Sequence, residues 1–531
     1  MTPVVDERAF SVPAFLGNDP RVAVVGLGRT GVSAVGFLHR LGVECVAMDS
    51  RPRPPGLEAV RQYEGIAVFA GALRGDVLAR ATHILVSPGL PLDEPVIRSA
   101  LERGVALISD IDLFAALARA PVIAVTGSNG KSTVTSLVAE MARLAGMRVR
   151  AGGNLGTPAL DLLCPECDLY VLELSSFQLE RSRKLRLDAG AVLNVSPDHL
   201  DRHPSVAAYA AIKGKLFAWS HCQVANRDDP LVAGLAENAS AAADSEPGAG
   251  RGRNPGQSHK SISPSPSGRG ARGEGDKSHL PEGEGLQHRA KSTPNGKNGG
   301  RAIVLGRNPD CCQTQTLWFS LEDPGADYGL LDVRGEPWLA RRGEPLLEAA
   351  GVALSGRHNL ANALAALALA EAGGIPLEPA LEALRRFGGL PHRMQRAGEI
   401  DGVVWINDSK GTNVGATEAA ISGLEGPVVL LAGGVGKGAD FSSLRPAVEA
   451  KVRMAILFGS DRRLLAEALA PATRVVEVED LETAMVVARR NAKPGETVLL
   501  SPACASLDQF EDYQARGNLF ESVVRRWQSM D

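Results

Sequence analysis

The sequence predicts an α/β protein with three domains, and three observations support this. The chain has 531 residues, and at roughly 100–200 residues per domain this length corresponds to about three domains. Short apolar runs alternate with helical stretches, which is the pattern of doubly wound parallel sheets. Hydrophobic residues make up 44% and aromatic residues only 4%, so we expect packed cores built mainly from aliphatic side chains.

Charge and cysteine content exclude several other classes of protein. The net charge of −4 argues against a protein that binds nucleic acid or an anionic membrane mainly by charge. Seven cysteines are too few for a disulfide scaffold in a chain of this length. Residues 1–20 lack the apolar core of a signal peptide, and no run of about 18 residues is apolar enough to span a bilayer. We therefore expect a cytoplasmic protein with no nucleic-acid or membrane partner, and we also expect a monomer.

The first domain begins with a strand, a glycine turn and a helix. Arg21–Val25 is a β-branched run, Gly26-Leu-Gly28-Arg-Thr-Gly31 follows it, and a helical stretch covers Val32–Leu41. A second apolar strand, Val43–Met48, leads to Asp49. Such glycines allow a phosphate to approach the N-terminus of a helix, so the motif predicts a phosphorylated nucleotide without identifying it, and NAD or FAD remains an alternative.

The second domain begins with a sharper motif. The strand Val122–Val125 runs into Thr126-Gly-Ser-Asn-Gly-Lys-Ser-Thr133, and a helix continues to Leu144. Backbone N–H groups of such a loop point at phosphate oxygens, Lys131 adds a positive charge, and a serine next to the lysine can bind Mg²⁺. Val125 stands where the generic phosphate loop has its first glycine, so this loop is a shorter variant.

Further apolar runs and helical patterns complete the second domain and predict a third. We expect additional strands at 83–86, 169–172, 191–195, 403–406, 428–431, 454–458 and 497–500, and helices at 359–372 and up to about residue 387. The turn at 388–391 is a natural boundary between the last two domains. Domain limits of 1–112, 113–390 and 391–531 follow from these patterns.

Residues 241–300 fit none of these elements. They contain no aromatic residue and are rich in glycine, proline, serine and charges of both signs. Such a segment cannot bury enough apolar surface to offset its ordering entropy, so we expect a disordered insertion in the second domain.

Two stretches of the second domain carry candidate metal or phosphate ligands. Glu173 lies inside a strand-like apolar run, where a carboxylate is costly unless it is paired or binds a cation. Asp198-His-Leu-Asp-Arg-His203 follows another strand, and ligands of open α/β sheets bind at such ends. A structural salt bridge at Glu173 and a structural role for His199 remain alternatives. Cys164-Pro-Glu-Cys167 is a single pair without a second one, so we expect no zinc site.

Together these motifs resemble the Mur ligase family. The resemblance extends in order over nearly the whole chain outside the insertion, and it is carried by the segments 126–133, 152–156, 172–180, 194–202, 358–362, 389–393, 407–413 and 501–510. It implies a Rossmann-like first domain that holds a UDP-linked substrate, a central P-loop-type ATP-binding domain, and a Rossmann-like third domain that binds glutamate and closes on ATP.

The resemblance also implies a reaction. ATP phosphorylates the alanyl carboxylate of UDP-N-acetylmuramoyl-L-alanine, and D-glutamate attacks the acyl phosphate, a step of peptidoglycan precursor synthesis that uses Mg²⁺. A sister ligase that adds another amino acid, including L-glutamate, is the alternative within the family. Outside it, an NAD(P)-dependent oxidoreductase and a non-catalytic nucleotide-binding regulator are alternatives.

The resemblance assigns roles to individual residues. The expected catalytic residues are Lys131, Glu173, His199 and Lys213, of which Ser132, Glu173, His199 and a carbamylated Lys213 would contact Mg²⁺. The expected ATP-binding residues are Gly127, Ser128, Asn129, Gly130, Lys131, Ser132, Thr133, Asn362, Arg393 and Asp408. The UDP-linked substrate is expected at Arg29, Thr30, Ser50, Arg51, Ser87, Gly89, Asn154 and His199. Glutamate is expected at Lys410, Thr412, Lys437, Ser506 and Tyr513.

Three positions depart from the family pattern. Tyr513 stands where phenylalanine is expected, Gly411 where alanine is common, and Arg29 where the uracil loop has an apolar residue. None of these changes removes a charge that the reaction needs. A surface helix lysine is the alternative for Lys213.

Overall fold

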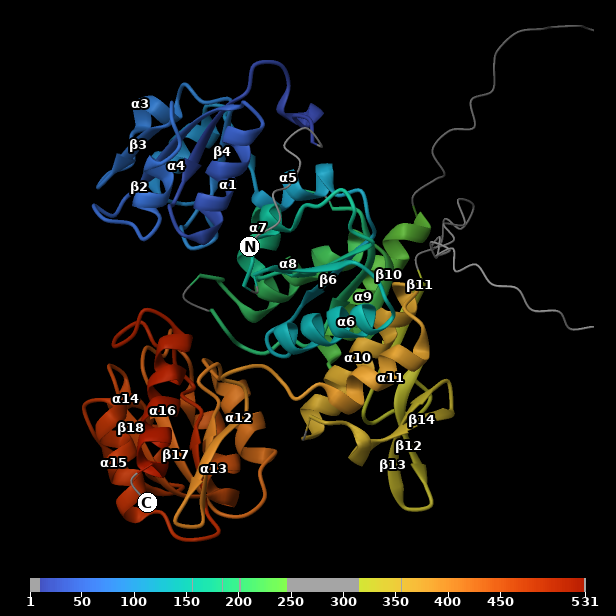
Figure 1. Cartoon of the computed structure of the whole chain (residues 1–531), viewed down its shortest axis with the longest axis vertical. Helices are drawn as coiled ribbons and strands as arrows, with labels where there is room; N and C mark the ends of the chain where they lie inside the picture. Colours follow the sequence, from blue (N-terminus) through green and yellow to red (C-terminus); the bar gives the residue numbers. More distant parts are fainter. Residues whose placement is uncertain are drawn as a thin grey trace, which may run out of the picture. The chain divides into compact units, whose positions relative to one another are not determined.

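The computed structural model describes residues 10–154, 156–183, 185–199, 202–245, 315–354 and 356–529, and these ranges contain three separate β-sheets (Figure 1). The expected insertion at 241–300 lies outside the described residues from residue 246 onward. Its first five residues are instead the end of helix α9 (Pro230–Ser245). In the described part of the chain, no helix is long and apolar enough to cross a membrane.

The first sheet has five parallel strands in the order β3-β2-β1-β4-β5. The strands are β1 (Arg21–Val25), β2 (Glu44–Asp49), β3 (Ala67–Ala70), β4 (His83–Val86) and β5 (Ala106–Ile108). This order places the carboxyl ends of β1 and β4 side by side, where the strand order reverses and ligands of such folds bind. Helices α1 (Arg29–Arg40), α2 (Leu57–Arg61), α3 (Gly75–Leu78) and α4 (Pro95–Glu102) connect the strands.

The second sheet has nine strands, in the order β14-β13-β12-β11-β10-β9-β6-β8-β7. Its parallel part comprises β6 (Val122–Thr126), β7 (Val149–Gly153), β8 (Leu169–Glu173), β9 (Leu187–Val192), β10 (Ser220–Asn226) and β11 (Gln315–Phe319). Strands β6 and β8 are buried along their whole length, as expected for a sheet covered on both faces. One face carries α6 (Lys131–Leu144), α10 (Arg357–Ala372) and α11 (Leu377–Arg386), whose aliphatic side chains form one core cluster with the sheet.

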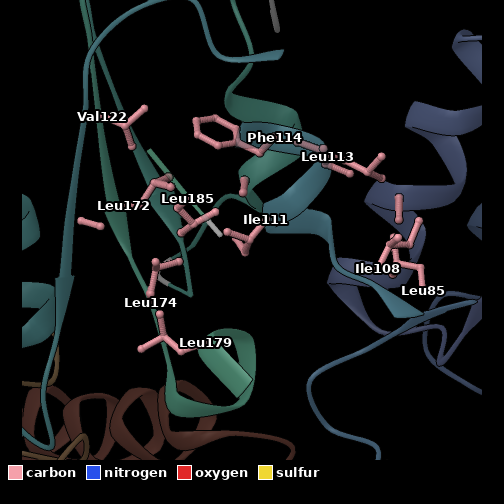
Figure 2. Close-up of a cluster of buried hydrophobic side chains, with 14 of the residues drawn as sticks. Leu85, Ile108, Ile111, Leu113, Phe114, Val122, Leu172, Leu174, Leu179 and Leu185 are labelled. Carbon is pink, nitrogen blue, oxygen red and sulfur yellow. The ribbon is translucent and has the colours of Figure 1, made fainter. Parts of the chain in front are cut away.

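The other face is covered by α7 (Ser176–Arg181), α8 (Val206–Ala218) and α9, and its core continues around helix α5 (Asp110–Leu117). Figure 2 shows Ile111 and Phe114 of α5 gathered with Leu172, Leu174 and Leu185. The Phe114 ring meets that of Tyr170 edge to face at 5.1 Å. Helix α5 begins with a capping box in which Ser109 and Asp112 exchange hydrogen bonds, so the chain enters this helix in a fixed direction.

The third sheet has six strands in the order β15-β16-β20-β17-β18-β19. Strands β16 (Val403–Asn407), β17 (Val428–Gly433), β18 (Val452–Phe458), β19 (Arg474–Glu477) and β20 (Thr497–Leu500) are parallel, and β15 (Gln395–Ile400) pairs antiparallel at the edge. The described helices of this domain are α12 (Val414–Ser422), α13 (Arg445–Lys451), α14 (Arg462–Leu469), α15 (Leu481–Asn491) and α16 (Tyr513–Gln528).

The α/β class is thus confirmed, with corrections to two elements. The strand expected at 191–195 is wrong in its bounds, because β9 covers Leu187–Val192 and the apolar residues after it are loop. Helix α1 begins at Arg29, three residues before the expected start. An antiparallel meander, β12 (Tyr328–Val333), β13 (Glu336–Arg341) and β14 (Glu344–Glu348), extends the second sheet beyond what was expected.

Candidate active site

The phosphate loop lies between β6 and α6, as expected, and its backbone is arranged for an anion. Gly130 has φ 82° and forms the N-cap of α6, so the first N–H groups of a 14-residue helix face the loop. The Lys131 Nζ donates to the carbonyls of Gly127 at 2.8 Å and Ser128 at 2.7 Å. Burial lowers the pKa of Lys131, and the nearby Glu173 carboxylate opposes this. The loop therefore offers a dipole and a positive charge to a phosphate group.

Glu173 lies at the end of β8 and faces this loop. It is 2% exposed, and its carboxylate accepts hydrogen bonds from Ser132 Oγ at 2.5 Å and Asn154 Nδ2 at 2.6 Å. Burial alone would raise the pKa of Glu173, but Lys131 and these two hydrogen bonds hold it below its usual value. Glu173 is therefore an ionised carboxylate beside the phosphate loop, and the serine that follows Lys131 lies within its reach.

A cavity of about 420 Å³ contains most of the expected catalytic and ATP-binding residues. Of the expected residues, Ser128, Asn129, Gly130, Lys131, Ser132, Thr133, Asn154, Glu173, His199, Lys213, Asn362, Arg393, Asp408, Lys410 and Thr412 line it. Arg393 Nη2 donates to Ser132 Oγ at 2.6 Å, which joins residues 261 positions apart in the sequence. Positive charges from Lys131, Arg393 and Lys410 therefore converge on one space.

Lys213 is the most deeply buried of the expected catalytic residues. It is 1% exposed, its Nζ donates to the carbonyl of Gly127 at 2.8 Å, and it lies 4.3 Å from the centre of the Tyr209 ring. Burial lowers its pKa well below the usual value, and the charge of Lys131 adds to this effect. A surface lysine, the alternative for this position, is excluded.

His199 and Asp198 also line the cavity. His199 has φ 54°, a left-handed conformation that is uncommon outside glycine, and its ring meets that of Phe177 at 4.9 Å. Burial alone would raise the pKa of Asp198, but Lys437 at 3.1 Å holds it low. Sequence reasoning selected His199 and did not assign a role to Asp198, although both stand in the same ligand-rich stretch.

Asn362 and Asp408, two of the expected nucleotide contacts, line the same cavity. A Cβ atom on Gly130 would lie 2.3 Å from Asn362 Oδ1, so the close approach of α10 to the loop requires glycine there. Asp408 is 7% exposed and accepts a hydrogen bond from Ser501 Oγ at 2.7 Å, and burial raises its pKa to about 7. A Cβ on Gly411 would lie 2.6 Å from both Asp408 Oδ2 and Ser501 Oγ, which explains the absence of alanine at this position.

The residues expected to bind glutamate lie in the third domain. Lys410 Nζ lies 3.9 Å from the centre of the Tyr513 ring, and burial lowers the pKa of Lys410 to about 8. Lys437 reaches Asp198, and Ser506 is buried at the start of a turn that Phe510 N closes. Sequence reasoning missed Asn413, whose Nδ2 donates to Asn129 Oδ1 and Asp198 Oδ2, both at 3.2 Å.

The residues expected to hold UDP lie in the first domain, at the ends of its central strands. Ser87 Oγ donates to the carbonyl of Gly26 at 2.7 Å, and Thr30, Ser50, Arg51 and Gly89 are at least partly exposed. Arg29 borders a separate cavity of about 830 Å³ beside α1 and α2. That these residues hold the UDP-linked substrate stays a prediction.

The hydrogen bonds of Asp49 argue against the alternative that the chain is an NAD(P)-dependent oxidoreductase. An acidic residue at this point of a dinucleotide-binding fold binds ribose hydroxyls. Asp49 is 1% exposed here and already accepts hydrogen bonds from Leu27 N at 2.8 Å and from the backbone and guanidinium of Arg51. Its oxygens are therefore occupied by the protein itself.

Comparison with known families gives three matches in chain order. Residues 20–109 match the N-terminal domain of MurD-like Mur ligases, residues 125–252 match the Mur ligase middle domain, and residues 392–504 match the glutamate ligase domain of Mur ligases. The chain is 45% identical to a UDP-N-acetylmuramoylalanine--D-glutamate ligase of Methylococcus capsulatus, over 98% of each chain. It is 43% identical to the ligase of the same name from Nitrosococcus oceani, over 95% of this chain and 97% of that one.

Solved structures share the fold at lower identity. The UDP-N-acetylmuramate-alanine ligase MurC of Thermotoga maritima is 17% identical and superposes with a TM-score of 0.55, covering 96% of this chain and all of that one. MurF of Acinetobacter baumannii is 15% identical, with a TM-score of 0.53 over 94% of this chain and 93% of that one. The three sheets, the phosphate loop facing Glu173, and the near full-length similarity lead to one conclusion: this chain belongs to the Mur ligase family.

Proposed function

We propose that this chain is the ATP-dependent ligase that adds D-glutamate to UDP-N-acetylmuramoyl-L-alanine in the cytoplasm. The observation that carries the proposal is the single cavity in which the phosphate loop with Lys131 meets Arg393 and Lys410 of the third domain. The ligases of Methylococcus capsulatus and Nitrosococcus oceani carry the name of this reaction, and this chain is 45% and 43% identical to them. We expect the enzyme to act as a monomer.

The charges of the cavity suit a reaction between two anions. The alanyl carboxylate of the substrate is a poor electrophile, and transfer of the γ-phosphoryl group of ATP to it supplies a leaving group. The carboxylate and the phosphate repel each other, so cations must lie between them. Lys131 and Arg393 hold the phosphates, and Lys410 with Lys437 would receive the carboxylates of the incoming glutamate.

The residues around Glu173 fit a magnesium ion. Mg²⁺ in ATP-dependent enzymes is held by one or two carboxylates together with phosphate oxygens and water. Glu173 is ionised, buried and next to the Ser132 hydroxyl, and His199 borders the same cavity. Mg²⁺ bound there would neutralise charge on the phosphates during transfer. Glu173 would hold it, and Asn154 would orient Glu173 through the hydrogen bond to Oε1.

Lys213 has the properties of a lysine that reacts with carbon dioxide. Burial lowers the pKa of its ammonium group well below the usual value, and the neutral amine is the nucleophilic form of lysine. The amine nitrogen bonds to the carbon of carbon dioxide and releases one proton, giving an anionic carbamate whose oxygens suit a hard cation. We expect Lys213→Ala to lose most activity and acetate to restore part of it. Wild-type kcat in this variant would contradict the role.

The amino-acid specificity tests the proposed function directly. Phosphate release from ATP is measured with UDP-N-acetylmuramoyl-L-alanine and, in separate reactions, D-glutamate, L-glutamate, meso-diaminopimelate or L-alanine. We expect release and product with D-glutamate only. Product with another amino acid would identify the chain as a sister ligase of the family, and the absence of product with all four would overturn the proposal.

A further inference from the structure

Helix α7 runs from the expected ATP cavity to the loop after β4, which is expected to contact the UDP-linked substrate. It begins at Ser176 with Ser175 as its N-cap, and Ser175, Ser176 and Phe177 line the cavity at this end. Leu179 in its middle is fully buried in the core cluster drawn in Figure 2. Arg181, its last residue, has a side chain that is 0% exposed. A displacement of this helix would therefore move both the residues that line the cavity and Arg181 at the other end.

The Arg181 guanidinium lies against the loop after β4. Its Nη2 donates to the carbonyl of Leu90, and its Nη1 donates to the carbonyl of Phe177 at 2.7 Å and to Glu180 Oε2 at 3.2 Å. Arg202 Nη2 also donates to the Leu90 carbonyl, at 3.3 Å. Two arginines of the middle domain thus hold one carbonyl of the first domain.

The loop that Arg181 holds is the one expected to contact the substrate. Leu90 N donates to the carbonyl of Ser87 at 3.1 Å, and Ser87 Oγ donates to the carbonyl of Gly26. A Cβ on Gly26 would lie 2.8 Å from Ser87 Cβ and 2.9 Å from Leu90 Cδ1, so loop and glycine turn are in close contact. The position of Leu90 therefore fixes the space between residues 87–90 and the glycine turn.

Burying a charged arginine side chain costs desolvation free energy, and this cost argues against a purely structural role for Arg181. Burial lowers the pKa of Arg181 and the positive charge of Arg202 adds to this effect, while Glu180 and the buried Asp110 oppose it. Leucine or methionine would fill this place without a desolvation penalty. The five donors of the guanidinium, in contrast, can hold two carbonyls from different domains in one geometry.

We propose that Arg181 is a positioning residue for the UDP-linked substrate: it sets the 87–90 loop from the end of the helix that begins at the ATP cavity. This rests on the proposed function, because it takes residues 87–90 as part of the substrate site. Arg181 itself contacts no reacting atom, so its removal is expected to weaken substrate binding and to leave the chemical step intact.

The test compares Arg181→Met with Arg183→Met as the matched control. Arg183 is exposed and donates to the carbonyl of Leu107 at 3.0 Å, so it also joins the two domains but does not touch the 87–90 loop. For Arg181→Met we expect KM for UDP-N-acetylmuramoyl-L-alanine to rise about tenfold, with KM for ATP and kcat within about twofold of wild type. Arg183→Met is expected to keep all three constants.

Two results would overturn the inference. One is an unchanged KM for the UDP-linked substrate in Arg181→Met, and the other is an equal rise in the Arg183→Met control. If Arg181→Met does not fold, Arg181→Lys decides, because it keeps the charge but loses the planar pair of donors; we expect its KM to rise about threefold, and an unchanged KM would refute the role. Absence of ligation by the wild type would instead overturn the proposed function.

Discussion

Removal of the Lys131 side chain is expected to lower kcat strongly and to leave the protein folded. Its Nζ is held by two carbonyls of its own loop, and no described carboxylate lies within ion-pair distance of it. We expect Lys131→Ala to lower kcat on the order of 100-fold or more, because the charge of the transferred phosphoryl group is then uncompensated. Circular dichroism should show a folded protein, since burial of this charge opposes folding. The exposed Lys493→Ala serves as the control, and near wild-type kcat for Lys131→Ala would refute the role.

Asp408 makes stability depend on pH in an unusual direction. Its pKa is about 7 in the folded protein, whereas an unfolded aspartate titrates near about pH 4, so the folded state binds more protons between these values. Its contribution to the free energy of unfolding therefore falls as pH rises from about 4 to 7. We expect Asp408→Asn to have a Tm difference from wild type that becomes more positive, by about 2 °C, between pH 5 and pH 8.

The exposed turn residue Asp401 provides the control for this measurement. Asp401 has φ 52°, a conformation that asparagine also tolerates, so Asp401→Asn preserves the backbone. At each pH, the Tm difference of Asp408→Asn from wild type is compared with that of Asp401→Asn. A constant difference between the two variants would show that Asp408 is not protonated in the folded enzyme.

Helix α6 allows the same substitution at both of its ends, with different expected results. Gly130 at its start and Gly146 after its end have φ 82° and 80°, so alanine costs about 1–2 kcal/mol at either position. A Cβ on Gly146 meets no atom within 4 Å, whereas one on Gly130 meets Asn362. We expect Gly146→Ala to lower Tm and keep kcat and KM for ATP, and Gly130→Ala to raise KM for ATP at least tenfold in addition. Equal kinetics in the two variants would contradict the close packing of α10 on the loop.

The elements that the sequence predicts well are those with strong local signals. Strands β1, β6 and β20 are short β-branched or aliphatic runs next to glycine or proline turns, and their bounds agree with the structure within one residue. The expected strand at 191–195 fails because the apolar run continues into the loop, where Leu193 is buried beside Gly127. Hydrophobicity alone does not distinguish a buried strand from a buried loop. The turns Arg334-Gly335 and Arg342-Gly343, both with positive φ, are a hairpin signal that could have revealed the β12–β14 meander.

At the scale of the whole molecule, the cavity depends on contacts that no local pattern contains. The phosphate loop and Glu173 could be predicted because the loop directly follows strand β6 and Glu173 is the last residue of strand β8. The hydrogen bonds of Arg393 with Ser132 and of Lys437 with Asp198 join residues 261 and 239 positions apart. Their proximity follows from packing between domains, and the sequence suggested it only through resemblance to a family. The same reason explains why Asp198 and Asn413 were not selected.

The central claim is that this cavity transfers a phosphoryl group from ATP to a carboxylate. Substrate labelled with oxygen-18 in the alanyl carboxylate tests this directly, because one carboxylate oxygen leaves with the phosphate when the amine displaces it. After turnover with ATP and D-glutamate, mass spectrometry of the released phosphate is expected to show one labelled oxygen per molecule formed. Unlabelled phosphate, or label in AMP, would contradict the account.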